Sequence, residues 1–179
     1  MGIDLSMDSL IEYTGWEREK WHAFLRQHGA EALRISAGPN SGSRFMSVGD
    51  LIKHIFSAEK RYIERLSDRP LTDTAVIPPY DVEALFELSA QSRKDLRQFI
   101  ATFPKQRWDT PEEQKLGNSV LTVTPRKIIA HILLHEIRHW AQIATLLRMQ
   151  GLTDGFHDFL FSPAMGREIR REQGSASTR

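Results

Sequence analysis

Three histidines lie within nine residues, in the run His131-Ile-Leu-Leu-His135-Glu-Ile-Arg-His139. If the run is helical, residues four apart share one face and are separated by about 6 Å along the helix axis. Two imidazoles placed in this way can bind one metal ion, because neutral imidazole nitrogen is a common metal ligand. The run therefore predicts part of a metal site, and the third ligand has to come from another segment.

The helix rise limits which of these histidines can share an ion. His131 and His139 are eight residues apart, which places them about 12 Å apart along the axis, whereas a metal–nitrogen bond is about 2 Å long. The pair His131/His135 or the pair His135/His139 can bind, but not all three. The residues leave this choice open. His54, in another amphipathic segment, is the best candidate for the third ligand.

The histidines lie within the apolar stripe of their helix and not on its solvent face. On a helical wheel, Ile128, Ile132 and Ile143 fall on or beside the face of His135 and His139. A buried imidazole needs a hydrogen-bond partner or a metal to offset its lost hydration. One such histidine is usually a hydrogen-bonded core residue. Three in one stripe make metal binding as good an explanation as packing.

Length and composition are those of a single globular domain. The chain has 179 residues, of which 40% are hydrophobic and 26% charged, and its net charge is +1. The balanced charge gives no electrostatic basis for binding nucleic acid. The absence of cysteine excludes disulfides, thiolate ligands and a cysteine nucleophile. Without a signal-peptide pattern or an apolar stretch of about 20 residues, we expect a cytoplasmic protein with no membrane span.

Hydrophobic periodicity predicts four long helices, at residues 9–27, 47–67, 81–102 and 125–150. Asp8 or Ser9 is the expected cap of the first helix, and Ser47-Val-Gly-Asp50 resembles a capping box. Thr124 followed by a proline predicts the start of the last helix, and Gly151 its end. These features predict an all-α protein, a four-helix bundle, in whose core facing helices can build metal sites.

Loops and one hairpin are predicted between the helices. Residues 35–45, rich in Gly and Ser, and residues 68–80, with three prolines, are expected to be connectors. Within residues 108–124, a Gly-Asn turn signal and a β-branched run predict a small hairpin or extended excursion. Residues 1–166 are expected to form the single domain, and residues 167–179 a frayed polar tail.

Two stretches of the chain resemble the DinB/YfiT-like superfamily of four-helix bundles. Leu51-Ile-Lys-His54-Ile-Phe-Ser-Ala-Glu-Lys-Arg-Tyr-Ile is similar to the second helix of that family. The stretch from His131 to Gly151 resembles its fourth-helix signature, in which an H-x-x-x-H pair precedes a glutamine. The resemblance follows the helix order over nearly the whole chain. It implies a divalent metal bound by His54, His135 and His139, and so selects the second of the two possible pairs.

One position departs from the family pattern. The family commonly has Arg-Gly between the second histidine of the pair and the glutamine, where this chain has Trp140-Ala141. The three ligand positions are intact, so only a contact made by that arginine is put in doubt.

The resemblance implies two kinds of chemistry at a three-histidine site with open coordination positions. Some relatives are thiol-dependent transferases or isomerases, and others are only described as metal-dependent hydrolases. We therefore expect a metal-dependent enzyme with a small-molecule substrate, using Zn, Ni, Fe, Cu or Mn. Because the chain has no cysteine, any thiol would be a low-molecular-weight cosubstrate. The alternative is a non-catalytic stress-response or interaction bundle in which the metal is structural. Family members are often dimers, which implies a homodimer.

Gln142 and His131 are the candidate supporting residues. Gln142 lies one turn beyond His139, where it could orient a ligand or bind substrate, or serve helix packing as a buried amide. His131 could lie beside the site or simply pack against a neighbour.

Charged residues near the histidines are expected to lie at the edge of the site. Arg61 and Arg65 share the stripe of His54 and could meet an anionic substrate, although such side chains are usually solvated. Glu136 and Arg138 are expected to flank the stripe of His135.

Overall fold

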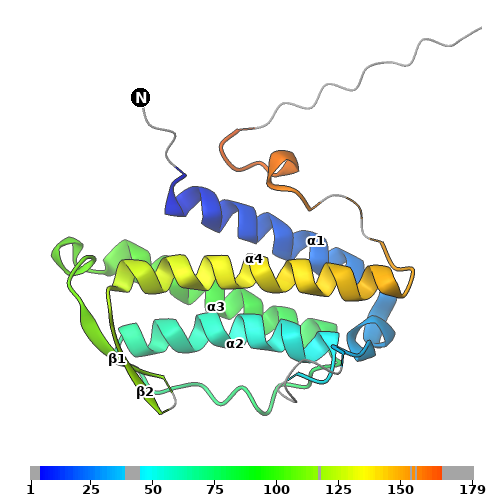
Figure 1. The fold of residues 1–179 in the computed structure, drawn as a ribbon, viewed down its shortest axis with the longest axis horizontal. Helices are drawn as coiled ribbons and strands as arrows, with labels where there is room; N and C mark the ends of the chain where they lie inside the picture. The colour runs from blue at the N-terminus through cyan, green and yellow to red at the C-terminus, as the bar shows by residue number, and fades with distance from the viewer. Residues whose placement is uncertain (1–4, 39–44, 117, 154, 156, 167–179) are drawn as a thin grey trace, which may run out of the picture.

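The computed structural model describes residues 5–38, 45–116, 118–153, 155 and 157–166. Its elements are α1 (Met7–Arg34), α2 (Val48–Leu66), α3 (Val82–Thr102), η1 (Lys105–Arg107), β1 (Glu112–Leu116), β2 (Ser119–Val123), α4 (Pro125–Met149) and η2 (Phe159–Phe161). The predicted all-α bundle is confirmed, as is the hairpin between its third and fourth helices (Figure 1). The expected tail at residues 167–179 lies outside the described residues.

The predicted helix caps of α2 and α4 are confirmed. The Ser47 hydroxyl accepts from the Asp50 backbone N–H at 3.2 Å, and the Asp50 carboxylate accepts from the Ser47 N–H at 3.1 Å. The Thr124 hydroxyl caps α4 by accepting from the Lys127 N–H at 3.2 Å, ahead of a proline in the first turn. Gly151 ends that helix with a φ of 76°, a left-handed conformation that glycine adopts without strain.

Helix α1 is longer at both ends than predicted. Ser6, rather than Asp8 or Ser9, is its N-cap, and the Ser6 hydroxyl accepts from the Ser9 N–H at 3.0 Å. Beyond Gln27 the chain kinks at Gly29, where φ is 64° and ψ is −157°, and then continues to Arg34. The predicted end of the helix lies near this kink, because the apolar periodicity is interrupted at this glycine.

Helices α2 and α3 run in the same direction because the connector between them, residues 67–81, returns along α2. Thr72 donates its backbone N–H to the Glu64 carboxylate at 2.9 Å, near the end of α2. Lys53, near the start of α2, donates to the Ile77 carbonyl at 2.6 Å. The chain therefore begins α3 at the end of the bundle where α2 begins, and α1 and α4 run in the opposite direction (Figure 1).

Gly49 is the point of closest approach between α2 and this connector. A Cβ atom at Gly49 would collide with the backbone carbonyl of Pro79. We expect Gly49→Ala to lower the free energy of unfolding by about 1–3 kcal/mol, because the connector would have to move. Gly15→Ala is the matched control: its Cβ meets nothing within 4 Å, and alanine should stabilise the interior of α1 by roughly 0.5–1 kcal/mol. Urea denaturation of both variants tests the pair, and equal shifts would contradict the expectation.

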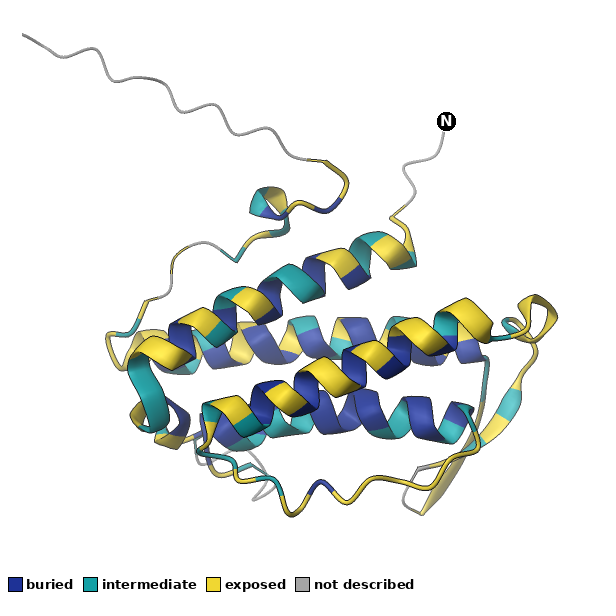
Figure 2. Ribbon diagram, turned by 180° about the vertical axis from the view of Figure 1, so that it is seen from behind, coloured by how far each residue is buried: buried dark blue, intermediate teal, exposed yellow. Residues whose placement is uncertain are grey.

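The core consists of two apolar clusters, with the buried faces of all four helices turned inward (Figure 2). One cluster gathers around Trp21, Leu25, Phe56, Leu85 and Trp140. The other gathers around Ile11, Ile63, Leu96, Phe99, Ile129 and Leu133. In the described part of the chain, no helix combines the length and the apolar character needed to cross a membrane.

A layer of buried charge lies among the helices, in the middle of their lengths. Arg18, Glu59, Arg93 and Glu136, one from each helix, are each 8% exposed or less. Arg18 and Arg93 both donate to Glu136, at 2.7 and 2.8 Å. The prediction that Glu136 flanks the stripe is therefore wrong: it points into the core, where two arginines offset the cost of burying its charge.

Candidate metal centre

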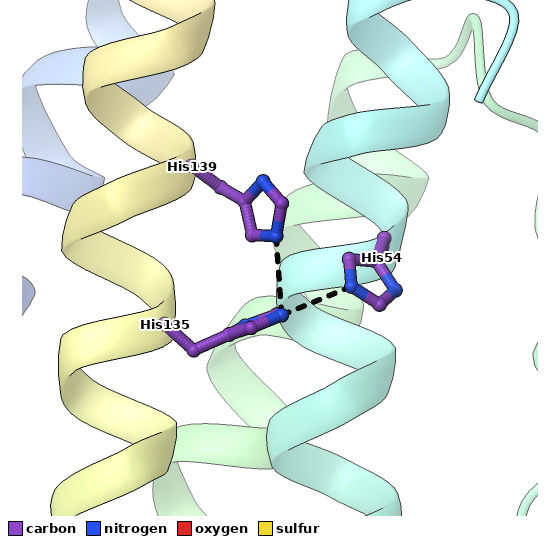
Figure 3. Close-up of side chains that lie close together, drawn as sticks. All are labelled: His54, His135 and His139. Atoms are coloured by element: carbon purple, nitrogen blue, oxygen red, sulfur yellow. Dashed lines mark hydrogen bonds between the residues drawn. The ribbon is translucent and has the colours of Figure 1, made fainter. Parts of the chain in front are cut away.

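His54 from α2 and His135 and His139 from α4 converge on one point between two adjacent helices (Figure 3). The Nε2 atom of His135 lies 3.0 Å from Nε2 of His54 and 3.1 Å from Nε2 of His139. One ring nitrogen from each residue lies within 4.8 Å of the other two. The structure thus brings together the three residues that the family resemblance selected.

The two contacts that His135 makes have the spacing of metal ligands. With metal–nitrogen bonds of 2.0–2.1 Å, two ligand atoms lie about 2.9 Å apart at a right angle and about 3.3 Å apart at the tetrahedral angle. The observed separations of 3.0 and 3.1 Å fall between these values. A divalent ion could therefore enter the cluster with small movements of the imidazole rings.

Gln142 determines which nitrogen of His139 carries its proton. The Gln142 side-chain oxygen lies 3.1 Å from Nδ1 of His139. A carbonyl oxygen can only accept, so Nδ1 is the donor and the neutral ring directs the lone pair of Nε2 at the cluster. Without a metal, only one of the two short contacts of His135 can be a hydrogen bond, because Nε2 of His139 cannot donate and Nε2 of His135 carries at most one proton. A single cation, by contrast, can accept a lone pair from all three neutral rings.

Burial keeps His135 in the neutral form that binds metals. Loss of hydration, followed by the proximity of His139, His131 and Arg138, lowers the pKa of His135 to about 4. At neutral pH its imidazole is therefore uncharged, and no proton has to leave before a metal binds.

His131 lies outside the three-histidine cluster. It is exposed, and its ring centroid is 5.4 Å from that of His135 and 5.6 Å from that of Tyr62. The rings of His54 and His139 instead contact Phe45, at centroid distances of 4.6 and 6.2 Å, so an apolar ring covers part of the site. Sequence reasoning missed this contribution of Phe45, because it lies in a connector with no periodic pattern.

The candidate charged residues lie at the edges of α2 and α4. Arg61 is half-buried and donates to the Ser57 carbonyl at 3.2 Å, and Arg65 lies over the Tyr62 ring. Arg138 is exposed. None of these three arginines is among the side chains that converge on the nitrogen cluster.

The departure at Trp140 has a structural role in this chain. The Trp140 indole is 2% exposed, stacks on Trp21 at 5.3 Å and donates to the Glu136 carboxylate at 3.1 Å. The residue that replaces the family's arginine therefore packs in the core, facing away from the imidazoles.

Within the described ranges, no fourth histidine, aspartate or glutamate joins the three imidazoles. Three protein nitrogens leave coordination positions for other molecules. The fold and the cluster together define a helical bundle with three histidines that could hold one metal ion.

The chain belongs to the DinB family, whose family model matches residues 3–172. A comparison with curated proteins finds no match.

Replacing Gln142 with leucine should weaken metal binding without affecting folding. Gln142 is exposed, so the substitution leaves the core intact, but His139 loses the acceptor that fixes its tautomer. Outer partners of this kind are typically worth about 10- to 100-fold in metal affinity. Titration with Zn²⁺ against a competing chelator measures the change, and Thr145→Leu, one turn further along α4, is the matched control. Unchanged affinity in Gln142→Leu would rule out the orienting role.

Proposed function

We propose that this protein is a divalent-metal-dependent enzyme whose metal is held by His54, His135 and His139, and that it acts as a thiol-dependent transferase or a hydrolase. The observation that carries the proposal is the convergence of three imidazoles, with the Nε2 atom of His135 at ligand spacing from those of His54 and His139 and no fourth described protein ligand. Membership of the DinB family is compatible with metal binding.

A divalent ion held by three neutral imidazoles would lower the pKa of a water molecule or thiol that it binds and polarise a bound substrate. The chain's own residues supply the rest of the environment. His135 and His139 offer lone pairs from one rigid helix, and His54 approaches from the neighbouring helix. Phe45 adds an apolar surface beside two of the rings, which reduces access of water to that side.

A low-molecular-weight thiol is the cosubstrate that we propose for the transferase reaction. The chain contains no cysteine, so a thiol cannot come from the protein itself. The histidine donor set suits Zn, Ni, Fe, Cu or Mn. The proposed substrate is a small molecule.

The first test is the metal content of protein purified without an affinity His-tag or chelators. We expect close to one equivalent of a divalent metal per chain, or uptake of one equivalent of added Zn²⁺. A metal content of a few tenths or less, with no uptake, would refute the proposal.

The second test separates the enzyme from the alternative bundle with a structural metal. In Co²⁺-loaded protein, 2-mercaptoethanol should produce a sulfur-to-cobalt charge-transfer band, because thiolate can occupy an open position. A structural ion closed off by four protein ligands would show no such band. A positive result would justify a screen of electrophiles with thiol cosubstrates.

A further inference from the structure

The buried charge layer connects the two helices that carry the histidines. Arg18 of α1 donates through Nε and Nη2 to the two carboxylate oxygens of Glu136 on α4, at 2.7 Å in each case. The same guanidinium donates to the two oxygens of Glu59 on α2, at 3.2 and 3.0 Å. Helices α2 and α4 are thus both bonded, through paired contacts, to one group on a third helix.

Glu136 directly follows His135, so the direction of one side chain sets the direction of the other. Successive residues point about 100° apart around a helix. With Glu136 fixed in the core, α4 has one rotational setting, and in that setting His135 faces α2. Trp140 donates to the Glu136 carboxylate at 3.1 Å and stacks on Trp21 of α1 at 5.3 Å, so the next turn, where His139 lies, is also packed against α1.

Metal binding is sensitive to this setting. A side chain reaches about 5–6 Å from the helix axis, so a rotation of about 20° moves its tip by about 2 Å. That displacement is as long as a metal–nitrogen bond. A small rotation of α4 would therefore separate His135 and His139 from His54.

Contacts from α3 to the two carboxylates oppose such a rotation. Arg93 of α3 donates to Glu136 at 2.8 Å, and Ser92 donates to Glu59 at 2.8 Å, so both carboxylates have partners from a further helix. Glu59 and Glu136 are each 1% exposed. At such burial, a carboxylate that leaves its partners finds no water to replace them, and each contact is held in place.

We propose that Arg18 is a positioning residue of the metal centre. By holding Glu59 and Glu136 together, it sets the angle and spacing at which His54 faces His135 and His139. This inference rests on the proposed metal-binding function. Arg18 acts through the two carboxylates and the helices that carry them.

The test variant is the double substitution Arg18→Met with Glu136→Gln. It removes one positive and one negative charge, and leaves Arg93 paired with Glu59, which lie 3.3 Å apart. We expect the dissociation constant for Co²⁺ to rise about 10-fold or more, the scale of outer-partner effects. The visible spectrum of bound Co²⁺ should also change, because it reports coordination geometry, which a loss of stability alone would not alter.

The control variant is Lys60→Met with Asp95→Asn. This buried pair, 2.6 Å apart, joins α2 to α3 and does not reach α4. The control should lower the urea midpoint but leave the Co²⁺ affinity and spectrum as in the wild type. Equal effects of the two double variants on the Co²⁺ spectrum would overturn the proposal.

Arg18→Lys provides the same test with the buried charge retained. A lysine ammonium is a compact charge that cannot form paired bonds to two carboxylates at once. We expect the Co²⁺ spectrum to shift in the same direction as in the double variant, and by less. A wild-type chain that takes up neither Zn²⁺ nor Co²⁺ would refute the metal function itself. Wild-type binding with unchanged affinity and spectrum in the variants would refute only the positioning role.

Discussion

His135→Ala should abolish tight metal binding, with a loss of affinity of at least about 100-fold, larger than the effect of removing an outer partner. His135 is the central member of the cluster, because its Nε2 lies within 3.1 Å of both other Nε2 atoms. Without it, two imidazoles remain, and two nitrogens hold a divalent ion far more weakly than three. Titration with Zn²⁺ against a chromophoric chelator measures the loss, and circular dichroism checks that the helices are retained.

His131→Ala is the matched control for this prediction. His131 precedes His135 by one turn, has the same side chain and lies on the same helix, but it is exposed and outside the cluster. Its replacement should leave the metal affinity close to that of the wild type. If His131 and His135 were the ligand pair, His131→Ala would lose metal affinity and His139→Ala would not. A large loss in His131→Ala with none in His139→Ala would therefore contradict the assigned ligand set.

Glu136→Ala should lower the free energy of unfolding of the metal-free protein by about 3–5 kcal/mol, the cost of removing one partner from a buried ion pair. Glu136 accepts from Arg18, Arg93 and Trp140, and its loss leaves two buried guanidinium groups with only Glu59 to neutralise them. Urea denaturation without metal isolates this effect from ligand binding. Glu83→Ala, which removes an exposed partner of Arg26, should leave the midpoint nearly unchanged.

The acid sensitivity of folding should depend on the same carboxylate. Burial alone would raise the pKa of Glu136, but the nearby charges of Arg18 and Arg93 outweigh it and hold the pKa below the ordinary 4.5. The stabilising contribution of Glu136 is therefore present above pH 4.5 and is lost as the pH falls through the lower folded-state pKa. Below pH 4.5, unfolding free energy should fall more steeply in the wild type than in Glu136→Gln. Parallel curves would contradict this assignment.

The helices and their caps were predictable because their signals are local. The Ser47–Asp50 capping box, the Thr124 cap and the Gly151 stop each depend on residues within one turn of the helix end. The start and the end of α1 were misplaced, because Ser6 caps it two residues before Asp8 and because Gly29 kinks the helix without ending it.

The candidate site was only partly predictable. Helix geometry showed that His131 and His139 cannot share an ion, and the family resemblance then favoured His135, His139 and His54. The structure brings these three together and leaves His131 exposed. The rotation of α4 relative to α2 made that selection, and the apolar pattern of α4 alone does not fix that rotation closely enough to choose between His131 and His139.

The sequence contained a sign that the charged residues of this layer are buried, contrary to our prediction for Glu136. Arg18, Glu59 and Glu136 each occupy the middle of an apolar series with helical spacing, as in Ile129, Leu133, Glu136, Trp140 and Ile143. A charge in such a series has to be buried or to lie at its edge. A single helix does not show which, because the answer depends on whether a countercharge from another helix meets it.

The sequence by itself determined the four helices, the hairpin and the histidine pair one turn apart, because periodicity and capping act over a few neighbouring residues. Only the tertiary structure decided that α2 and α3 are parallel, that His54 meets His135 and His139, and that Arg18 joins Glu59 to Glu136. These contacts link residues tens of positions apart. They depend on the register and rotation of whole helices, which are set by the packing of the core and by the long connector along α2.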